Sequence, residues 1–335
     1  MSNLLLLFTD TFPFLKGEQY LNEEFKYLES KFSTIYVIPI NFSDNKRNGF
    51  QHVNVININD ELKIKKLHLI KNLYSYIRLL AYDRSKINKK NIQSIHHANE
   101  TSNYLINLIN KSAVDYDKVT VYSYWFYHSA LIAGFIKKKI PQIKAISRAH
   151  MGDVYEEINN QNFVKLKLRY LDQVVTISDH AKEYLAKKNP NLSNKIITSR
   201  LGVKDFGISP INKNKKFFTI ITCSSITKRK RLDKIVEALK ISKHNIKWVH
   251  FGDGDQMSEI KKSAESLPSN IQFDLKGWLP NEQVFEYYRS NSVDLFINIS
   301  LEEGIPVSIM EAISFGIPIL AFNVYGLKEI VNDVN

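Results

Sequence analysis

The sequence has a single cysteine, Cys223, among its 335 residues. One thiol cannot form an intrachain disulfide, nor can it supply the several thiolates of a Cys-based zinc or iron–sulfur site. This favours a reducing environment such as the cytosol. Long hydrophobic runs are lacking too: the apolar run Leu4–Phe8 is broken by Thr9 and Asp10, which leaves it too short for a signal peptide or a membrane span. We therefore interpret this run as a buried strand.

Acidic residues are outnumbered: 34 Asp and Glu face 46 Lys and Arg, for a net charge of +12 at pH 7. Such a balance favours an anionic partner, which is a nucleic acid, a phosphate-bearing ligand or an acidic lipid surface. The basic residues cluster in one loop and one helix rather than along a recognition element, so we predict no nucleic-acid partner. No two histidines have the H-x-x-H spacing of a metal site, and we predict no bound metal.

Short apolar runs, many of them β-branched, alternate with amphipathic stretches along the chain. The alternation predicts βαβ units with parallel sheets, and 335 residues exceed what one core usually supports. We predict the α/β class, with two Rossmann-like, doubly wound domains facing across a cleft. Their ranges are 1–202 and 217–335, joined by a polar linker over 203–216. The predicted strands are 4–8, 35–40, 119–122, 143–147, 174–177 and 195–198, then 217–223, 247–251, 271–275, 293–299 and 317–321.

The C-terminal end is short. After the last predicted strand we expect only a short helix over 327–331, with no closing helix behind it. Because a domain normally ties its end down, we expect that the second domain is either truncated or natively short.

The densest group of candidate site residues lies between the last two predicted strands. Gly304 relieves backbone crowding and Pro306 suits the first turn of a helix, whose free N–H groups favour an anion. Glu303 and Glu311 follow this loop, and their carboxylates are suitable acceptors for sugar and ribose hydroxyls. On the residues alone, a surface helix with solvated Glu side chains is an equal interpretation.

The pattern E-G-x-P-x-x-x-x-E-A-x-x-x-G-x-P over 303–318 resembles the signature of retaining glycosyltransferases of family 4, which have the GT-B fold. Residues 13–18, 147–153, 224–233 and 251–254 resemble four further motifs of that family, in the same order. The resemblance covers nearly the whole chain. It implies transfer of a sugar from a nucleoside diphosphate sugar, of UDP or GDP type, to a glycan or polyprenyl-linked acceptor in the synthesis of a capsule or lipopolysaccharide. It also implies retention of anomeric configuration without a metal cofactor.

The same resemblance assigns the donor site to the second domain. It implies that Lys230, with Arg231 second, contacts the diphosphate, that Glu311 holds the ribose, and that Glu303 and the backbone of Gly304, Ile305, Pro306 and Val307 hold the sugar. A basic run of this kind is more usually a solvated surface. Relatives often have Arg in place of Ser225 and Gly in place of Tyr325, so a non-catalytic partner subunit with the same fold stays open.

In the first domain, His150 follows the predicted strand 143–147 and matches the family's strand-end histidine. The resemblance implies that it holds the donor sugar and assists at the reacting centre. Gly17 precedes a helix expected to begin near Glu18, where its backbone could approach a phosphate. The aromatic residues after the strand at Val119 either line an acceptor groove or pack in the core; they are Tyr122, Tyr124, Trp125 and Tyr127. We assign the adjacent pair His96 and His97 to solvent.

The segment 61–90 carries nine basic and two acidic residues, with apolar residues at helical spacing between them. A basic amphipathic helix of this kind either lies on an anionic membrane surface or packs its apolar face on the core. Contact with a membrane fits a lipid-linked acceptor. We therefore expect a cytoplasmic protein that is peripheral at the inner membrane face if this helix binds lipid.

Overall fold

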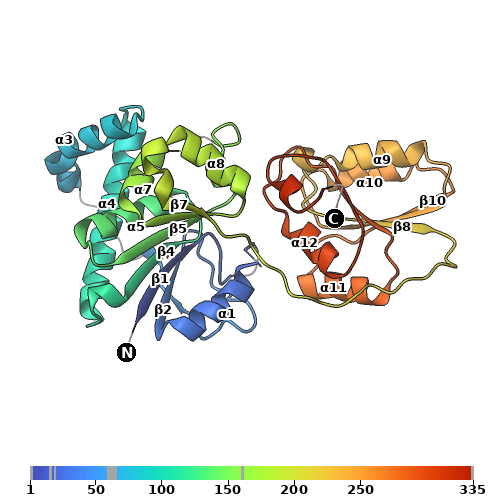
Figure 1. The fold of residues 1–335 in the computed structure, drawn as a ribbon, viewed down its shortest axis with the longest axis horizontal. Helices are drawn as coiled ribbons and strands as arrows, with labels where there is room; N and C mark the ends of the chain where they lie inside the picture. Colours follow the sequence, from blue (N-terminus) through green and yellow to red (C-terminus); the bar gives the residue numbers. More distant parts are fainter. Residues whose placement is uncertain (1–2, 15–16, 19, 59–65, 160–161, 333–335) are drawn as a thin grey trace. The chain divides into compact units, whose positions relative to one another are not determined.

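The computed structural model describes residues 3–14, 17–18, 20–58, 66–159 and 162–332 (Figure 1). The chain divides into two compact units, Met1–Ser199 and Arg200–Asn335. Part of the predicted linker lies with the second unit. Phe206 stacks on Phe315 and contacts Phe285, and the Ser209 N–H donates to the Phe315 carbonyl. The segment that follows the first unit is therefore packed rather than free.

The first unit is built on a parallel sheet in the order β3-β2-β1-β4-β5-β6-β7. The six strands predicted for this unit are confirmed. The two-residue strand β3 was not predicted because it is too short to show an alternating pattern. The bounds of the seven strands are β1 Leu4–Thr9, β2 Thr34–Pro39, β3 Asn54–Val55, β4 Val119–Ser123, β5 Lys144–Ala149, β6 Gln173–Thr176 and β7 Ile196–Thr198.

Helices cover both faces of this sheet. On one face α1 packs Leu21 and Phe25 against Leu5, Leu7 and Val37 of the central strands. A second layer is formed by α3, α4, α5 and α7, which pack on one another (Figure 1). Strand β1 is buried along its whole length, which explains its uninterrupted apolar sequence. The helices are α1 Leu21–Lys31, α3 Lys66–Asp83, α4 Lys89–Lys111, α5 His128–Lys139, α6 Met151–Val154, α7 Val164–Tyr170 and α8 Asp179–Lys188.

The prediction of one basic helix through residues 61–90 is wrong. Helix α3 ends at Asp83, Arg84 takes the left-handed conformation with φ of 61°, and Lys89 starts a new helix. Residues 61–65 lie outside the described part of the chain. In α3 the predicted apolar stripe is divided: Tyr76 and Leu80 are buried, whereas Ile70 and Leu73 are exposed.

The second unit is a three-layer α/β/α sandwich around a parallel sheet in the order β10-β9-β8-β11-β12. Helices α9 and α10 cover one face and α11 and α12 the other, each over its own apolar cluster. The five predicted strands are confirmed, whereas the helix expected over 327–331 is a 3₁₀ turn, Leu327–Glu329. The elements are β8 Phe218–Cys223, α9 Leu232–Lys240, β9 Ile246–Phe251, α10 Met257–Ala264, β10 Ile271–Leu275, α11 Asn281–Ser290, β11 Leu295–Asn298, α12 Val307–Ser314 and β12 Ile319–Ala321.

Candidate functional site

Each sheet has one place where the strand order reverses. It lies between β1 and β4 in the first unit and between β8 and β11 in the second. In open α/β sheets, ligands bind outside the carboxyl ends of the strands at such a switch point. The loops that follow these four strands hold the predicted site residues Gly17, Lys230 and Glu303, and His150 follows the neighbouring strand β5.

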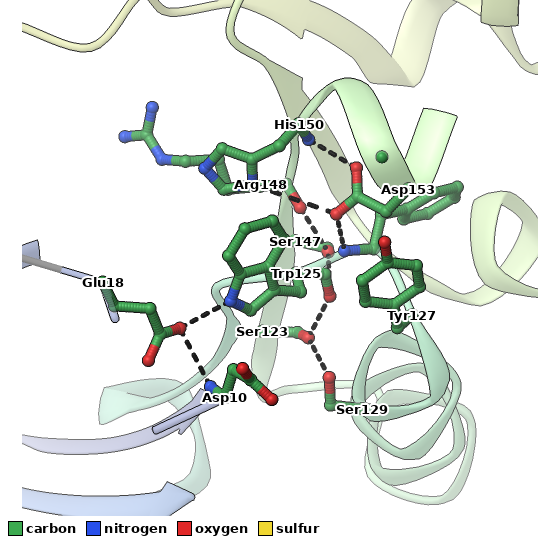
Figure 2. Close-up of polar contacts among 12 residues, drawn as sticks. Asp10, Glu18, Ser123, Trp125, Tyr127, Ser129, Ser147, Arg148, His150 and Asp153 are labelled. Atoms are coloured by element: carbon green, nitrogen blue, oxygen red, sulfur yellow. Dashed lines mark hydrogen bonds and ion pairs between the residues drawn. The ribbon is translucent and has the colours of Figure 1, made fainter. Parts of the chain in front are cut away.

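In the first unit, the buried Glu18 carboxylate holds the loop after β1. It accepts hydrogen bonds from the backbone N–H groups of Asp10 (2.9 Å), Thr11 (2.8 Å) and Phe12 (2.7 Å). A fourth donor is the indole N–H of Trp125, at 2.5 Å (Figure 2). Three consecutive backbone N–H groups pointing at one acceptor form an anion-binding turn, and in this chain the anion is supplied by Glu18 itself.

Trp125 connects this turn to His150. The two rings lie 4.3 Å apart between centroids (Figure 2). Tyr124 also packs on the imidazole, with 5.3 Å between ring centroids. Both ring nitrogens of His150 are buried and have no hydrogen-bond partner among the described residues. The ring is therefore held by aromatic packing beside the Asp153 carboxylate, and its buried nitrogens have unused hydrogen-bonding capacity.

Asp153 fixes the backbone on either side of this ring. Its Oδ1 accepts the His150 N–H at 2.5 Å, and its Oδ2 accepts the Phe126 N–H at 2.7 Å. The distance from Asp153 Oδ2 to His150 Nδ1 is 3.9 Å, too long for a hydrogen bond. Asp153 thus positions the loop that carries the histidine and leaves the imidazole free.

A buried lysine supports the same loop from below. The Lys167 ammonium donates to the Phe126 carbonyl at 2.5 Å and lies over the Phe126 ring, 4.1 Å from its centroid. Burial lowers the pKa of Lys167 to about 8, although Asp153 and Asp83 oppose this shift. Phe126 is therefore held at both its N–H and its C=O by charged side chains.

The predicted helix start near Glu18 is wrong, since α1 begins at Leu21 and Glu18 has φ of 47°. Gly17 has φ of 88°, and a Cβ there would lie 2.8 Å from the Thr11 hydroxyl oxygen. Glycine is therefore required for this turn. The Gly17 carbonyl accepts a hydrogen bond from the Arg47 guanidinium, which sequence reasoning missed.

The aromatic residues after β4 divide between the two predicted roles. Tyr122 and Tyr124 are buried and belong to the core over α1. Trp125 and Tyr127 stack on each other at 6.0 Å, and Tyr127 is exposed. Only the second pair can present aromatic surface to a ligand.

In the second unit, the structure brings Lys230 and Glu303 together. The Lys230 ammonium forms an ion pair with Glu303 Oε1, and both side chains are nearly buried. The Asn298 amide, from the end of β11, approaches the same carboxylate oxygen at 3.4 Å. The charges of Lys230 and Glu303 thus neutralise each other at the carboxyl ends of β8 and β11.

The two loops around this ion pair are joined by further bonds. The Leu301 N–H donates to the Arg229 carbonyl at 2.9 Å, and the Arg229 guanidinium donates to the Glu302 carbonyl at 3.0 Å. Arg231 has φ of 56° and lies over the Phe322 ring, 5.3 Å from its centroid. Lys230 is therefore presented by a loop held on both sides.

The Gly-Asp-Gly turn after β9 packs against this same loop. A Cβ on Gly252 would lie 1.8 Å from the Ser224 carbonyl oxygen, and one on Gly254 would lie 2.4 Å from that of Ile226. Only glycine permits such an approach of two backbones. The turn therefore fixes the position of the loop that carries Lys230.

Helix α12 follows the loop of Glu303. Pro306 precedes its first residue, and the first internal hydrogen bonds run from Ile309 and Met310 to the Pro306 carbonyl. The amides of the first turn before them are those of a helix start, which favours an anion. Gly304, Ile305 and Pro306 are buried in this turn, and Val307 is half-buried.

Glu311 lies one turn further along α12 and is buried. Its Oε1 accepts a hydrogen bond of 3.0 Å from the Asn281 side chain at the start of α11. Burial raises the pKa of Glu311 to about 7, which this hydrogen bond only partly opposes. The carboxyl can therefore change its charge near neutral pH.

Sequence reasoning missed several of these residues. Glu18, Asn281 and Asn298 belong to no spacing pattern that predicts these contacts, and the partners Trp125 of Glu18 and Glu311 of Asn281 lie far along the chain. The assignment of His96 to solvent is wrong: it is buried and its Nδ1 lies 3.2 Å from the Tyr76 hydroxyl. His97 lies 3.2 Å from His128.

Neither a metal centre nor a membrane-spanning helix is found among the described residues. They contain no cluster of three or more His, Cys, Asp or Glu side chains able to hold a metal ion. Within the same residues, no helix combines the length and the apolar character needed to cross a bilayer.

Comparison with known proteins identifies the second unit. Residues 204–335 match the family described as glycosyl transferases group 1. This unit is similar to a glycosyltransferase domain. The UDP-N-acetylglucosamine–peptide N-acetylglucosaminyltransferase GtfA subunit of Streptococcus pneumoniae is 27% identical over 144 residues, covering 42% of this chain and 27% of that protein. The amylovoran biosynthesis glycosyltransferase AmsK of Erwinia amylovora is 26% identical over 148 residues, 39% of this chain and 36% of its own length.

These two relatives are matched over about a third of their length or less. Structural similarity extends further. The apo form of the lipopolysaccharide outer core galactosyltransferase WaaB superimposes with a TM-score of 0.68 at 14% identity, covering 98% of this chain and 83% of that one. The chain thus has the GT-B fold class, with a parallel-sheet unit on each side of Ser199. The prediction of this fold class is confirmed.

Proposed function

We propose that this protein is a retaining glycosyltransferase of family 4. It would move a sugar from a nucleoside diphosphate sugar to a hydroxyl of a glycan or polyprenyl-linked glycan in the synthesis of a cell-surface polysaccharide. The observation that carries the proposal is the grouping of Lys230, Glu303 and the start of α12 at the switch point of a glycosyltransferase domain. The similarity to AmsK and WaaB, glycosyltransferases of amylovoran and lipopolysaccharide synthesis, supports the choice of acceptor.

In this proposal the donor binds to the second unit. Lys230 neutralises the diphosphate together with the first amides of α12, and Arg231 adds charge from the same loop. Positive charge from a lysine and a helix start is one way to stabilise a departing diphosphate without a metal ion. Glu311 accepts hydrogen bonds from the ribose hydroxyls, and Glu303 with the backbone of Gly304–Val307 accepts and donates to the sugar.

The ion pair of Lys230 and Glu303 has a consequence for this binding. A diphosphate that takes Lys230 must replace Glu303 as its partner, which frees the Glu303 carboxylate for sugar hydroxyls. Both groups are nearly buried, so neither is stable without a partner. Nucleotide and sugar would therefore be taken up together.

The first unit contributes His150. Its two unpartnered ring nitrogens allow one to accept and the other to donate a hydrogen bond. We propose that the ring holds the donor sugar and assists at the reacting centre, with Gly17 close to the phosphate. The stacked pair of Trp125 and Tyr127 offers an aromatic face to an acceptor sugar.

The donor nucleotide is proposed to be UDP or GDP. UDP-N-acetylglucosamine, the donor in the name of the GtfA subunit, is the first donor to test. Calorimetry with UDP, GDP and their sugars should show binding to the wild type, and Glu311→Ala should lose most of it while the circular dichroism spectrum stays unchanged. Equal affinity in the two proteins would refute the donor site. A partner subunit without turnover would bind the donor but give no transfer product.

We also propose that the protein is cytoplasmic and peripheral, with α3 on an anionic membrane surface. Ile70 and Tyr74 are 70% and 74% exposed on this helix, close to Lys71 and Arg78. Exposed apolar side chains among cations are typical of helices that lie at a lipid interface. Ile70→Ser with Tyr74→Ser should reduce flotation with phosphatidylglycerol vesicles, whereas Ile241→Ser, at an equally exposed position of the second unit, should not.

A further inference from the structure

A second hollow lies in the first unit, on elements that do not carry His150. It has a volume of about 620 Å³ and lies where the end of α3, the start of α4, the start of α7 and the end of α8 meet. Figure 1 shows α3, α4, α7 and α8 within the same part of this unit. The volume is within the range of small-ligand sites. Its lining is almost entirely polar, with five basic residues and two acidic ones.

The acidic residues of this pocket are already occupied. Asp83 accepts the Leu166 N–H at 2.9 Å and the Ser85 hydroxyl at 2.5 Å. Glu156 forms an ion pair of 2.8 Å with Lys188. The donors to Asp83 are neutral and leave it its charge, so the lining holds two negative charges against five positive ones.

Four cations of the lining are left. Arg84, Lys86, Lys90 and Lys165 line the pocket and form no ion pair with an acidic side chain of the described residues. They come from three different segments: the turn after α3, the first turn of α4 and the first turn of α7. Cations gathered from separate elements around one hollow create a positive potential that an anion would relieve.

The backbone at Arg84 is also unusual for its residue type. Arg84 is the residue after the last residue of α3, and it takes the left-handed conformation with φ of 61°. Helices commonly end with glycine at such a position, because a side chain there is strained. The chain nevertheless has arginine, and this residue lines the pocket.

The charged side chains at the start of α4 are basic, which destabilises the N-terminal end of a helix. This helix of 23 residues has no acidic residue in its first turn and begins with Lys89 and Lys90. The N-terminal end of a helix is positive, so acidic residues are favoured there and cations are not. A bound anion would compensate both the helix end and the lysines.

We propose that this pocket is a binding site for a phosphoryl or diphosphoryl group. Phosphate fits because arginine can contact two of its oxygens at once and lysines supply further point charges. The group could belong to an anionic lipid headgroup or to a soluble phosphate compound. In the first case, the exposed Ile87 beside Lys86 would contact the lipid next to its headgroup. The identity of the ligand rests on the proposed function, whereas the binding of phosphate does not.

The test uses the whole chain and inorganic pyrophosphate, titrated by calorimetry with UDP at saturation so that the donor site is filled. Arg84→Gly removes one pocket cation and relieves the backbone strain. Ala113→Gly is its matched control, because Ala113 also has a left-handed backbone after a helix, with φ of 53°, but no charge. We expect Arg84→Gly to bind pyrophosphate about tenfold more weakly, the effect of losing one charge-assisted hydrogen bond, and Ala113→Gly to bind it as the wild type does.

A second pair of variants removes the lysines. Lys86→Gln with Lys90→Gln should weaken pyrophosphate binding, whereas Lys111→Gln with Lys144→Gln removes equal charge elsewhere on the unit and should not. Unchanged affinity in both pocket variants would overturn the proposal. If the wild type did not bind UDP, that result would count against the proposed donor site. The pocket would still be tested by the difference in pyrophosphate affinity between the variants.

Vesicles distinguish the two sources of the phosphoryl group. With a lipid headgroup as ligand, pyrophosphate should release the protein from phosphatidylglycerol vesicles, and Arg84→Gly should float less with them. With a soluble ligand, Arg84→Gly should lose pyrophosphate binding and float as the wild type does. Either result supports the site, and neither is expected if the four cations are simply solvated.

Discussion

The indole N–H of Trp125 donates to the carboxylate of Glu18, 107 positions earlier in the chain, at 2.5 Å. The same carboxylate accepts three consecutive backbone N–H groups of the loop after β1, and the same indole packs on His150. One hydrogen bond therefore joins the loop of Gly17 to the ring proposed to act on the donor sugar. Three loops at the carboxyl edge of one sheet depend on it (Figure 2).

Glu18→Gln should destabilise the first unit by about 1–3 kcal/mol, because an amide in this place leaves at least one buried N–H without an acceptor. Urea unfolding followed by circular dichroism measures the loss. Glu23→Gln, which affects an exposed pair with Lys26 on α1, should change stability by less than about 1 kcal/mol. If both variants unfolded at the same urea concentration, the carboxylate would not have the role assigned to it.

Trp125→Phe separates positioning from stability. The variant keeps an aromatic ring beside His150 but loses the indole N–H, so Glu18 retains its three backbone donors. We expect a fall of about tenfold in kcat with little change in KM for the donor, since small misplacements of a reacting group reduce the rate of the chemical step. A change in KM alone would indicate that Trp125 acts only in binding.

The sequence was sufficient for every strand except the two-residue β3 and for placing several candidate residues at strand ends. Continuous apolar strands such as β1 carry their burial in their composition, and Gly17, Lys230 and Glu303 follow strands that parallel sheets bring to one edge. Glu18 could not be recognised in this way, because its side chain turns back onto its own loop and its fourth donor, Trp125, lies 107 positions away. The break at Arg84 was missed for a different reason: left-handed residues after helices are usually glycine.

Glu303→Gln should bind UDP more tightly than the wild type. The change removes the carboxylate that pairs with Lys230, so the ammonium becomes available to the diphosphate without first breaking an ion pair. Transfer should nevertheless fall, because an amide is a weaker acceptor for sugar hydroxyls than a carboxylate. Calorimetry with UDP and a transfer assay measure the two effects. Weaker UDP binding would show that Glu303 supports the lysine rather than competing for it.

Donor binding should depend on pH through Glu311. Burial raises the pKa of this carboxyl to about 7, so its ionised fraction falls about tenfold between pH 8 and pH 6 if it titrates there. An ionised carboxylate accepts ribose hydroxyls better than a protonated one, and UDP affinity should therefore rise with pH over this range. Glu311→Gln should bind more weakly and show no such rise, whereas the same pH dependence in this variant would assign the titration to another group.

The first unit should lose stability in acid through His128. Burial lowers the pKa of this imidazole to about 4, and His97 and Lys167 act in the same direction. Because the folded pKa lies below the unfolded value near 6.5, the unfolded chain binds more protons between pH 6.5 and 4, and the stability present above pH 6.5 falls as the pH is lowered through this window. The hydrogen-exchange protection factors of α4 and α5 peptides in the whole chain, corrected for the intrinsic exchange rate at each pH, should fall accordingly. His128→Gln should flatten this dependence, whereas His52→Gln, whose side chain is 61% exposed, should retain it; an unchanged profile in His128→Gln would assign the acid sensitivity to other groups.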